Sequence, residues 1–283
     1  MDLISSPAAG NHVEIAALDA GVILMEARFT DYAFERHSHD CYAIGVTGEG
    51  TQSFRCKGRR YDSRPGEFVL FNPDEDHDGD RGSSDGFRYQ MLYLPEQFVR
   101  DCVDADAGLD ASFYLQAPNL SDRRMARDFL RLARVLWTER YETLRAETLL
   151  REFIAGLLMQ HGERPRPEAI PPKAVGMEKL ARAKDYIRSN FWRELTVGEL
   201  ATVAGLSRAH LTRAFTAAFH TPPHVYLNAV RIAQAQRLIR NGMPLAAVAA
   251  ECGFSDQSHF ARRFKGSIGL APSQWRQAVL ART

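Results

Sequence analysis

The sequence lacks the features that mark membrane proteins, secreted proteins and the common enzyme classes. It has no run of about 18 apolar residues, which excludes a transmembrane helix. The first 21 residues have no basic start followed by an apolar stretch, so we expect no signal peptide. The four cysteines are scattered and form no C-x-x-C pair, as in proteins of a reducing cytosol. P-loop, nucleophile-elbow and H-E-x-x-H motifs are also missing, so we expect no enzyme and no catalytic residues.

Charge is nearly balanced over the 283 residues, at a net +1, but the two halves of the chain have opposite signs. Residues 173–283 contain 16 Lys and Arg against 6 Asp and Glu, a net charge of +10. Residues 1–172 contain 20 basic and 29 acidic residues, a net charge of −9. A basic domain attracts polyanions, so this split indicates nucleic acid as the partner of the C-terminal half.

Proline marks the boundary between the two halves. The segment 162–173, GERPRPEAIPPK, contains four prolines and can be neither a helix interior nor a central strand. It predicts an interdomain linker at 162–176. Before about residue 100, short runs of aromatic and β-branched residues alternate with glycine-containing turns, which predicts a barrel of short strands. These runs are 42–47, 51–55, 67–71 and 87–94.

Residues 121–161 change to helical spacing and predict two helices. Apolar residues recur at positions 125, 129, 132 and 136, and again at 149, 150, 153, 154, 157 and 158. An apolar stripe alone does not say what covers it. Two interpretations therefore stay open: the helical pair packs on the barrel, or it forms a dimer interface.

The C-terminal half contains an internal repeat. The segments 195–219 and 244–268 share the same order: a helix start, an Ala-rich amphipathic helix, a glycine, a polar cap and a second helix. Gly205 and Gly253 are 48 residues apart, whereas Arg213 and Arg262 are 49 apart, so the second copy has one extra residue in its turn. Each copy predicts a helix-turn-helix unit, in which the glycine supplies the left-handed residue between the helices.

Capping residues support this interpretation. Thr196 and Glu199 form a T-x-x-E capping box at the start of the first unit. Ser207 and Ser255 are placed to cap the two second helices. Pro244 is placed at the first helical position of the second unit.

The outward faces of the two second helices predict the DNA contacts. These faces carry side chains that suit base edges and phosphates in the major groove of double-stranded DNA. Between the units, residues 222–240 predict one helix of about 18 residues, roughly 27 Å long, which can hold both second helices on one side of the duplex. The candidate contact residues are Arg208, Ala209, Thr212 and Arg213 in the first unit, and Gln257, Ser258, His259 and Arg262 in the second.

Residues 177–279 resemble the DNA-binding domain of the AraC/XylS family of bacterial transcription regulators. The most specific part is 244–276, which ends in the form G-x-x-P-x-x-[WY]-R, here with Trp275 and Arg276. The resemblance implies a seven-helix domain, with helix-turn-helix units at 196–217 and 244–267 and base contacts from both. Members of the family often carry a large base-reading side chain where this sequence has Ala209, so we expect the second unit to be the stronger reader.

The N-terminal half is similar to cupin barrels and to AraC-type sensor domains. The similarity rests on an H-x-H at His37 and His39, a later Pro-Gly pair, and His77. Metal-binding cupins have a glutamate where this chain has residues 42–44. We therefore favour a small-molecule pocket near His37, His39, Tyr42 and His77 and predict no metal and no cofactor. The alternatives are a metal ion, or histidines that only satisfy loop backbone. The acidic run 74–80 is more typical of a solvated loop than of a site for a cationic ligand.

The sequence thus predicts an α+β protein of two domains: a cupin-like effector-binding barrel at 1–120 with a helical appendage at 121–161, and an all-α DNA-binding domain. We expect a sequence-specific transcription regulator controlled by a small-molecule effector, cytoplasmic in a bacterium and associated with the nucleoid through DNA. Its expected partners are a second copy of the chain and RNA polymerase, with no membrane. The rival hypotheses are a cupin-type oxygenase with a DNA-binding tail and an architectural DNA binder.

Overall fold

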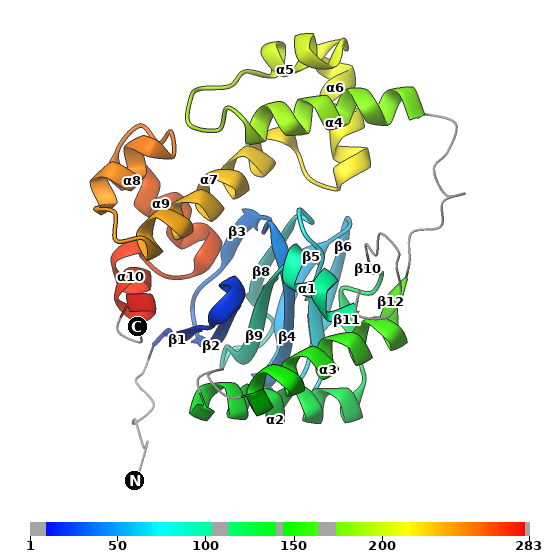
Figure 1. Cartoon of the computed structure of the whole chain (residues 1–283), viewed down its shortest axis with the longest axis vertical. Coiled ribbons are helices and arrows are strands. Elements are labelled where there is room, and N and C mark those ends of the chain that lie inside the picture. Colours follow the sequence, from blue (N-terminus) through cyan, green and yellow to red (C-terminus); the bar gives the residue numbers. More distant parts are fainter. Residues whose placement is uncertain (1–9, 104–112, 140–143, 164–173, 281–283) are drawn as a thin grey trace.

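The computed structural model describes residues 10–103, 113–139, 144–163 and 174–280. Figure 1 shows a β-rich N-terminal domain between two helical layers. One layer is the pair α2 (Arg123–Glu139) and α3 (Leu144–His161), which confirms the two helices expected from the apolar spacing. The other layer is the C-terminal helical domain on the opposite side of the strands.

Ten of the described strands form two antiparallel sheets instead of one closed barrel. The larger sheet has the order β1-β2-β9-β4-β7-β11 and the smaller one the order β3-β8-β5-β6. The larger sheet consists of β1 (His12–Ala17), β2 (Ile23–Phe29), β9 (Phe87–Pro95), β4 (Cys41–Gly50), β7 (Phe68–Phe71) and β11 (Asn119–Leu120). The smaller sheet consists of β3 (Phe34–His37), β8 (His77–Arg81), β5 (Gln52–Cys56) and β6 (Arg59–Ser63).

Short elements complete the N-terminal domain. A 3₁₀ turn at Asp19–Gly21 links β1 to β2, and α1 (Glu96–Val103) follows β9. The pair β10 (Tyr114–Leu115) and β12 (Gly162–Glu163) ties the end of α3 to the segment before β11. Part of the expected linker, residues 164–173, lies outside the described residues.

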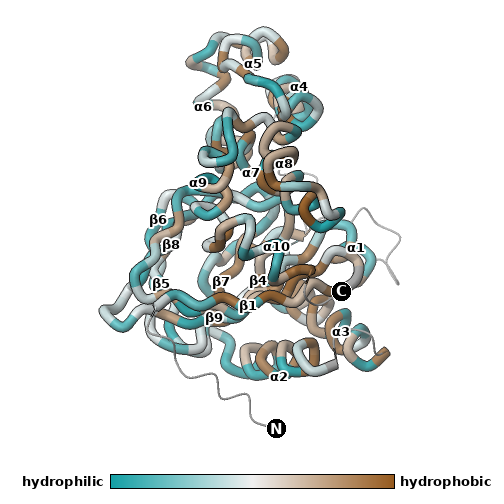
Figure 2. Tube along the Cα trace, turned by 90° about the vertical axis from the view of Figure 1, so that its left-hand side faces the viewer, coloured by the Kyte–Doolittle hydropathy of each residue, from teal (hydrophilic) through white to brown (hydrophobic). Residues whose placement is uncertain are grey.

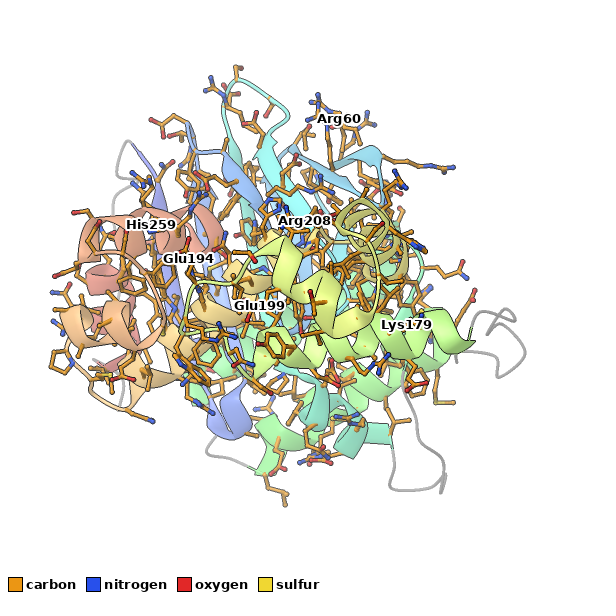
Figure 3. All side chains as sticks on the ribbon, turned by 90° about the horizontal axis from the view of Figure 1, so that it is seen from above. Arg60, Lys179, Glu194, Glu199, Arg208 and His259 are labelled. Carbon is orange, nitrogen blue, oxygen red and sulfur yellow. The ribbon has the colours of Figure 1, made fainter. Side chains whose placement is uncertain are left out.

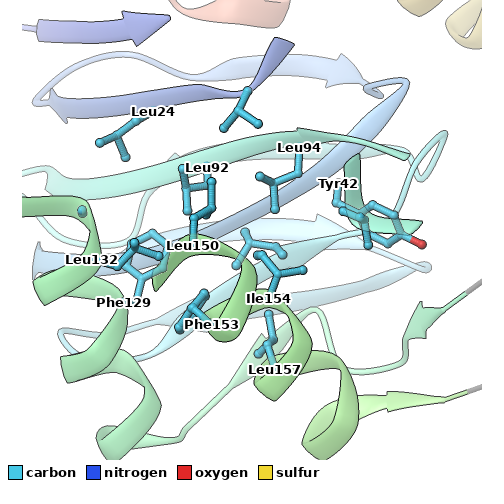
Figure 4. Packing of buried hydrophobic residues seen from close by; sticks show 14 of the residues in the cluster. Leu24, Tyr42, Leu92, Leu94, Phe129, Leu132, Leu150, Phe153, Ile154 and Leu157 are labelled. Carbon is cyan, nitrogen blue, oxygen red and sulfur yellow. The ribbon is translucent and has the colours of Figure 1, made fainter. Parts of the chain in front are cut away.

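The two faces of the larger sheet bury two different cores, because side chains alternate along a strand. Leu24, Ile44 and Phe68 point to one face and pack against α2 and α3. Figure 4 shows this core, with Phe129 of α2 and Phe153 of α3 next to Leu92. The apolar stripes of the helical pair are therefore covered by the domain's own sheet.

The other face of the larger sheet packs against both the smaller sheet and the C-terminal domain. Met25 and Phe71 belong to the same buried cluster as Phe54 of the smaller sheet and as Ile239 and Trp275 of the C-terminal domain. Figure 2 shows α10 next to β1 in a view turned by 90°, and α7 and α9 contact β3. The two domains thus share one continuous hydrophobic core.

The C-terminal domain has the seven helices that the resemblance implies. They are α4 (Ala174–Arg188), α5 (Val197–Ala204), α6 (Arg208–Phe219), α7 (Pro223–Arg240), α8 (Leu245–Glu251), α9 (Gln257–Ile268) and α10 (Pro272–Leu280). The long helix α7 joins the two units: Tyr226 near its start packs with the first, and Ile239 near its end with the second. Among the described residues, no helix combines the length and the apolar character needed to cross a membrane.

Candidate nucleic-acid interface and sensor site

The first helix-turn-helix unit has the predicted caps. The Thr196 hydroxyl accepts a hydrogen bond from the Glu199 N–H at 3.1 Å, and the Ser207 hydroxyl accepts one from the His210 N–H at 3.3 Å. Gly205 ends α5 in the left-handed conformation, with φ 61°. Hydrogen bonds from Arg193 and Tyr186 lower the pKa of Glu199, which keeps this carboxylate ionised at the helix start.

The second unit differs from the prediction at two positions. Asp256, and not Ser255, is the cap of α9: its carboxylate accepts the His259 N–H at 2.7 Å, and this bond is the largest cause of its lowered pKa. Pro244 lies one residue before the helix, at the cap of α8, and not at the first helical position. Asp256 takes the capping role because the turn after Gly253 is one residue longer than the turn after Gly205, which places the aspartate directly before the helix.

Buried aromatic and leucine side chains hold the two second helices in place. Leu211 and Phe215 of α6 are fully buried, as are Phe260 and Phe264 of α9, so each helix turns a fixed face outward. Of the eight predicted contact residues, seven are exposed and His259 is half-buried. In Figure 3, Arg208 of the first unit and His259 of the second are labelled in a view from the side of the helical domain.

His259 is held by its own turn. Its ring lies edge-on to Phe254, with 5.6 Å between ring centroids, and its Nδ1 lies 3.1 Å from the Ser255 hydroxyl. Burial and the nearby Arg263 and Arg262 lower its pKa, so the ring is neutral at pH 7. A neutral imidazole in this position has both a donor and an acceptor nitrogen for base edges or phosphate.

The C-terminal half of α9 is attached to the sensor domain, which the sequence did not indicate. Arg263 Nη1 lies 3.0 Å from Glu35 Oε2, and the Tyr32 hydroxyl donates to the carbonyl of Lys265. A Cβ at Gly266 would come within 3.1 Å of the Glu35 carboxyl group, so the sensor loop lies directly on the helix. No local signal identifies such a pair, because its members are 228 residues apart.

A second contact holds α4. The buried carboxylate of Asp74 lies 2.6 Å from Lys184 Nζ and 3.3 Å from Arg188 Nη2. The backbone N–H of Asp74 donates to the carbonyl of His39 at 2.6 Å. The prediction of a solvated acidic loop at 74–80 is therefore wrong for its first half. Asp74, Glu75 and Asp76 are all buried, and each of these carboxylates pairs with a basic side chain.

Three of the four predicted pocket residues lie together in the sensor domain. His37, His39 and His77 bring one ring nitrogen each within 4.8 Å of one another. Tyr42 lies apart from them: its ring belongs to the core between the larger sheet and α3 (Figure 4), where its hydroxyl donates to the Phe113 carbonyl at 2.6 Å.

Burial keeps the three imidazoles uncharged. It lowers the pKa of His37 to about 4, and it lowers the pKa of His39 and of His77 well below the ordinary value. Repulsion from the neighbouring histidines of the cluster lowers the pKa of His39 and of His77 further. The cluster therefore consists of neutral rings that can serve as hydrogen-bond acceptors or as metal ligands.

A cavity of about 180 Å³ lies between the two domains, next to the histidine cluster. The sensor contributes Ile23, Met25 and Tyr93, and the helical domain contributes Ile232 and Trp275, so the body of the cavity is apolar. Polar groups at its border come from both domains as well: His39, Asp40, Gln236 and Arg240. Burial raises the pKa of Asp40. Such a mixture of apolar walls and few polar groups is typical of small-molecule sites.

A sensor domain joined to paired helix-turn-helix units defines a ligand-responsive, DNA-binding transcription regulator. Two family models match the chain: the AraC-like ligand binding domain over residues 19–154 and the helix-turn-helix domain over residues 200–278. The chain belongs to the AraC family of transcriptional regulators, and its relatives are regulators and not enzymes.

Individual relatives span nearly the whole chain. The arabinose operon regulatory protein of Escherichia coli (strain K12) is 27% identical over 276 residues, which cover 92% of this chain and 89% of that protein. The HTH-type transcriptional regulator YbfI of Bacillus subtilis (strain 168) is 26% identical over 80% of this chain and 81% of its own length. Among solved structures, ToxT of Vibrio cholerae strain SCE256, with an unsaturated fatty acid bound, has the same two-domain fold, with a TM-score of 0.59 and 17% identity over 96% of this chain and 97% of its own.

Proposed function

We propose that this AraC-family regulator reads two successive major-groove segments of an operator with the outward faces of α6 and α9. The observation that carries the proposal is the pairing of buried anchors with exposed polar faces on both helices. The net charge of +10 over residues 173–283 supplies the attraction to phosphate. The proposed contacts are Arg208, Ala209, Thr212, Arg213, Gln257, Ser258, His259 and Arg262.

The second unit carries more of the base-reading chemistry. Arg262 suits the O6 and N7 acceptors of guanine, and Gln257 suits adenine, whereas Ala209 in the first turn of α6 offers only a methyl contact. The first unit then mainly positions the protein, through Arg208 and Arg213 on phosphates or guanine. This division predicts that operator changes opposite α9 weaken binding more than changes opposite α6.

We propose that the effector binds in the interdomain cavity, which has His39 at its border. A ligand in this cavity contacts the sensor and α7 at once, so the affinity for the ligand depends on how the two domains are arranged. This dependence is what couples effector binding to DNA binding. The apolar walls and the Arg240 guanidinium at the border fit a small molecule with an apolar body and an anionic group. ToxT, which shares the fold, was solved with an unsaturated fatty acid bound.

We propose a homodimer that uses the outer faces of α2 and α3. Leu144 and Met159 of α3 are 82% and 83% exposed, which is unusual for large apolar side chains on one helix. A second copy of the chain would cover them. RNA polymerase is a further proposed partner of the DNA-bound protein, in the bacterial cytoplasm at the nucleoid.

The experiment that tests the DNA-binding proposal is genome-wide mapping of bound sites, followed by footprinting of the strongest ones. We expect discrete sites in which two adjacent major-groove segments are protected, and an affinity that falls steeply as salt rises. Uniform protection without preferred sites would instead indicate an architectural DNA binder.

A further inference from the structure

The histidine cluster has the geometry of a site and not of a loop that happens to contain histidines. His37 on β3 and His77 on β8 are direct register partners, and His39 follows β3 by two residues. Their ring centroids are 4.4 Å apart for His37 and His77 and 4.8 Å apart for His37 and His39. The three rings therefore lie together, although His37 and His77 are 40 residues apart in the sequence.

Backbone carbonyls fix the tautomers of two of the rings. His37 Nδ1 lies 2.6 Å from the Glu35 carbonyl, and His77 Nδ1 lies 3.0 Å from the Glu75 carbonyl. A carbonyl oxygen only accepts, so each Nδ1 must carry the proton, and in a neutral ring each Nε2 then has a free lone pair. Metal-binding histidines in proteins are oriented in the same way, by donating the other ring nitrogen to a carbonyl or carboxylate.

The rings border a cavity of about 20 Å³, large enough for a single water molecule or ion. Two residues that line this cavity carry a buried polar atom without a hydrogen-bond partner among the described residues: Gln52 Oε1 and Ser267 Oγ. Both side chains are more than nine-tenths buried, with 5% and 8% exposed. Buried polar atoms without partners are costly, so their convergence on one small cavity indicates that something polar occupies it.

We propose that His37, His39 and His77 bind one divalent transition-metal ion of the Zn²⁺ type, with Gln52 Oε1 or a water molecule as the fourth ligand. Three imidazoles and one open position are a ligand set that Zn²⁺ adopts readily in tetrahedral geometry. Asp78 also borders the cavity, but its carboxylate accepts the backbone N–H of Arg55 at 2.7 Å. The sequence had favoured a small-molecule pocket at these histidines; the fixed tautomers and the size of the cavity favour an ion.

The metal ion would stabilise the surface on which the DNA-binding domain rests. Ser267 belongs to α9, and the His39 carbonyl accepts the backbone N–H of Asp74, whose carboxylate holds Lys184 and Arg188 of α4. The site thus contacts the second helix-turn-helix unit directly and the first through Asp74. This inference does not depend on the proposed effector or operator.

The test uses the full chain, stripped with a chelator and then titrated with Zn²⁺ and with Co²⁺. We expect one ion per chain by elemental analysis and the visible absorption of tetrahedral Co²⁺. In the wild-type protein, ¹⁵N–¹H correlation of the imidazoles should show the three ligating nitrogens shifting on addition of Zn²⁺. His77→Ala and His39→Ala should lower the affinity by more than about tenfold, since removal of an outer-shell partner alone costs 10–100-fold. His224→Ala, an exposed histidine on α7, is the matched control.

Failure of the folded wild-type protein to bind a stoichiometric ion would overturn the proposal. So would an ion that leaves the three imidazole resonances unmoved, or one that is lost in His224→Ala and kept in His39→Ala. The imidazole spectra decide the matter on the wild-type chain even where a histidine variant does not fold. DNA binding is measured separately, so loss of the metal site and loss of the operator function are distinguishable.

Discussion

Arg263 of the second recognition helix and Glu35 of the sensor domain form an ion pair, with 3.0 Å between Nη1 and Oε2. Arg263 follows directly after Arg262 and lies one helical turn after His259, and both of these residues are proposed DNA contacts. The sensor therefore holds α9 beside its proposed DNA face, and it places a carboxylate close to where DNA phosphates approach. Any movement of β3 reaches the reading helix through this pair.

The first prediction concerns this pair. Glu35→Gln should raise the affinity for an operator fragment by up to about fivefold, because exposed ion pairs contribute about 0.2–1 kcal/mol and a carboxylate near DNA repels phosphate. Fluorescence anisotropy with a labelled operator measures the effect. Glu14→Gln, on the exposed side of β1, is the matched control and should change nothing. A lower affinity in Glu35→Gln would show that the pair aligns α9 for binding.

The second prediction concerns base reading by α9. Arg262→Ala should weaken specific binding by about 1–3 kcal/mol and relax the preference at one base position, because a bidentate arginine–guanine contact is lost. Binding to a set of operators with single base changes measures both effects. Arg64→Ala, in the exposed turn between β6 and β7, removes the same charge away from the recognition helices and serves as control. Equal weakening on every sequence would make Arg262 a phosphate contact instead.

The third prediction concerns the attachment of α4. Asp74 has φ 63°, a conformation that asparagine also tolerates, so Asp74→Asn removes the charge and leaves the loop intact. We expect the contact with Lys184 and Arg188 to weaken by about 1–3 kcal/mol, since hydrogen bonds to charged groups are lost. Hydrogen exchange of the α4 amides should become faster, whereas Asp85→Asn in an exposed loop should leave it unchanged. Unchanged exchange in Asp74→Asn would mean that the apolar core alone holds the domains.

The fourth prediction concerns pH. Asp122 caps α2: it accepts the Met125 N–H at 3.0 Å and lies 3.1 Å from His161 Nε2, and these contacts lower its pKa below 3.8. A lowered pKa means that the stabilisation is complete above the unfolded value and is lost as pH falls through the folded one. Asp122→Ala should therefore cost about 1 kcal/mol of unfolding free energy at neutral pH. Urea titrations should show the difference shrinking below about pH 3.9. A constant difference at all pH values would assign the loss to packing.

The helical domain could be predicted almost completely, because its signals are local. The glycines at the turns, the serine and threonine caps and the i,i+4 anchor pairs such as Leu211 and Phe215 each act within a few residues. The errors were local too: Ser255 and Asp256 are adjacent capping residues, and only the length of the turn decides between them.

The sensor site could be predicted only in part, because it depends on long-range pairing. The H-x-H pattern and His77 predicted the cluster, but Tyr42 lies on the other face of its strand from Ala43, and sequence alternation alone does not say which face meets the histidines. The carboxylates at 74–76 are buried because Lys57, Arg36 and the basic residues of α4 meet them, and these contacts connect distant parts of the chain.

The hydrophobic core that crosses the domain boundary restricts which domains of related proteins can be combined with those of this protein. Trp275 and Ile239 of the DNA-binding domain belong to the same buried cluster as Met25 and Phe71 of the sensor domain. A DNA-binding domain fused to the sensor domain of another protein would therefore pack against side chains of a different shape. Such hybrids should be poorly soluble unless both sides of the joint are transplanted together. Substitutions on the two sides should therefore be coupled during divergence, and the pair of domains should behave as one inherited unit.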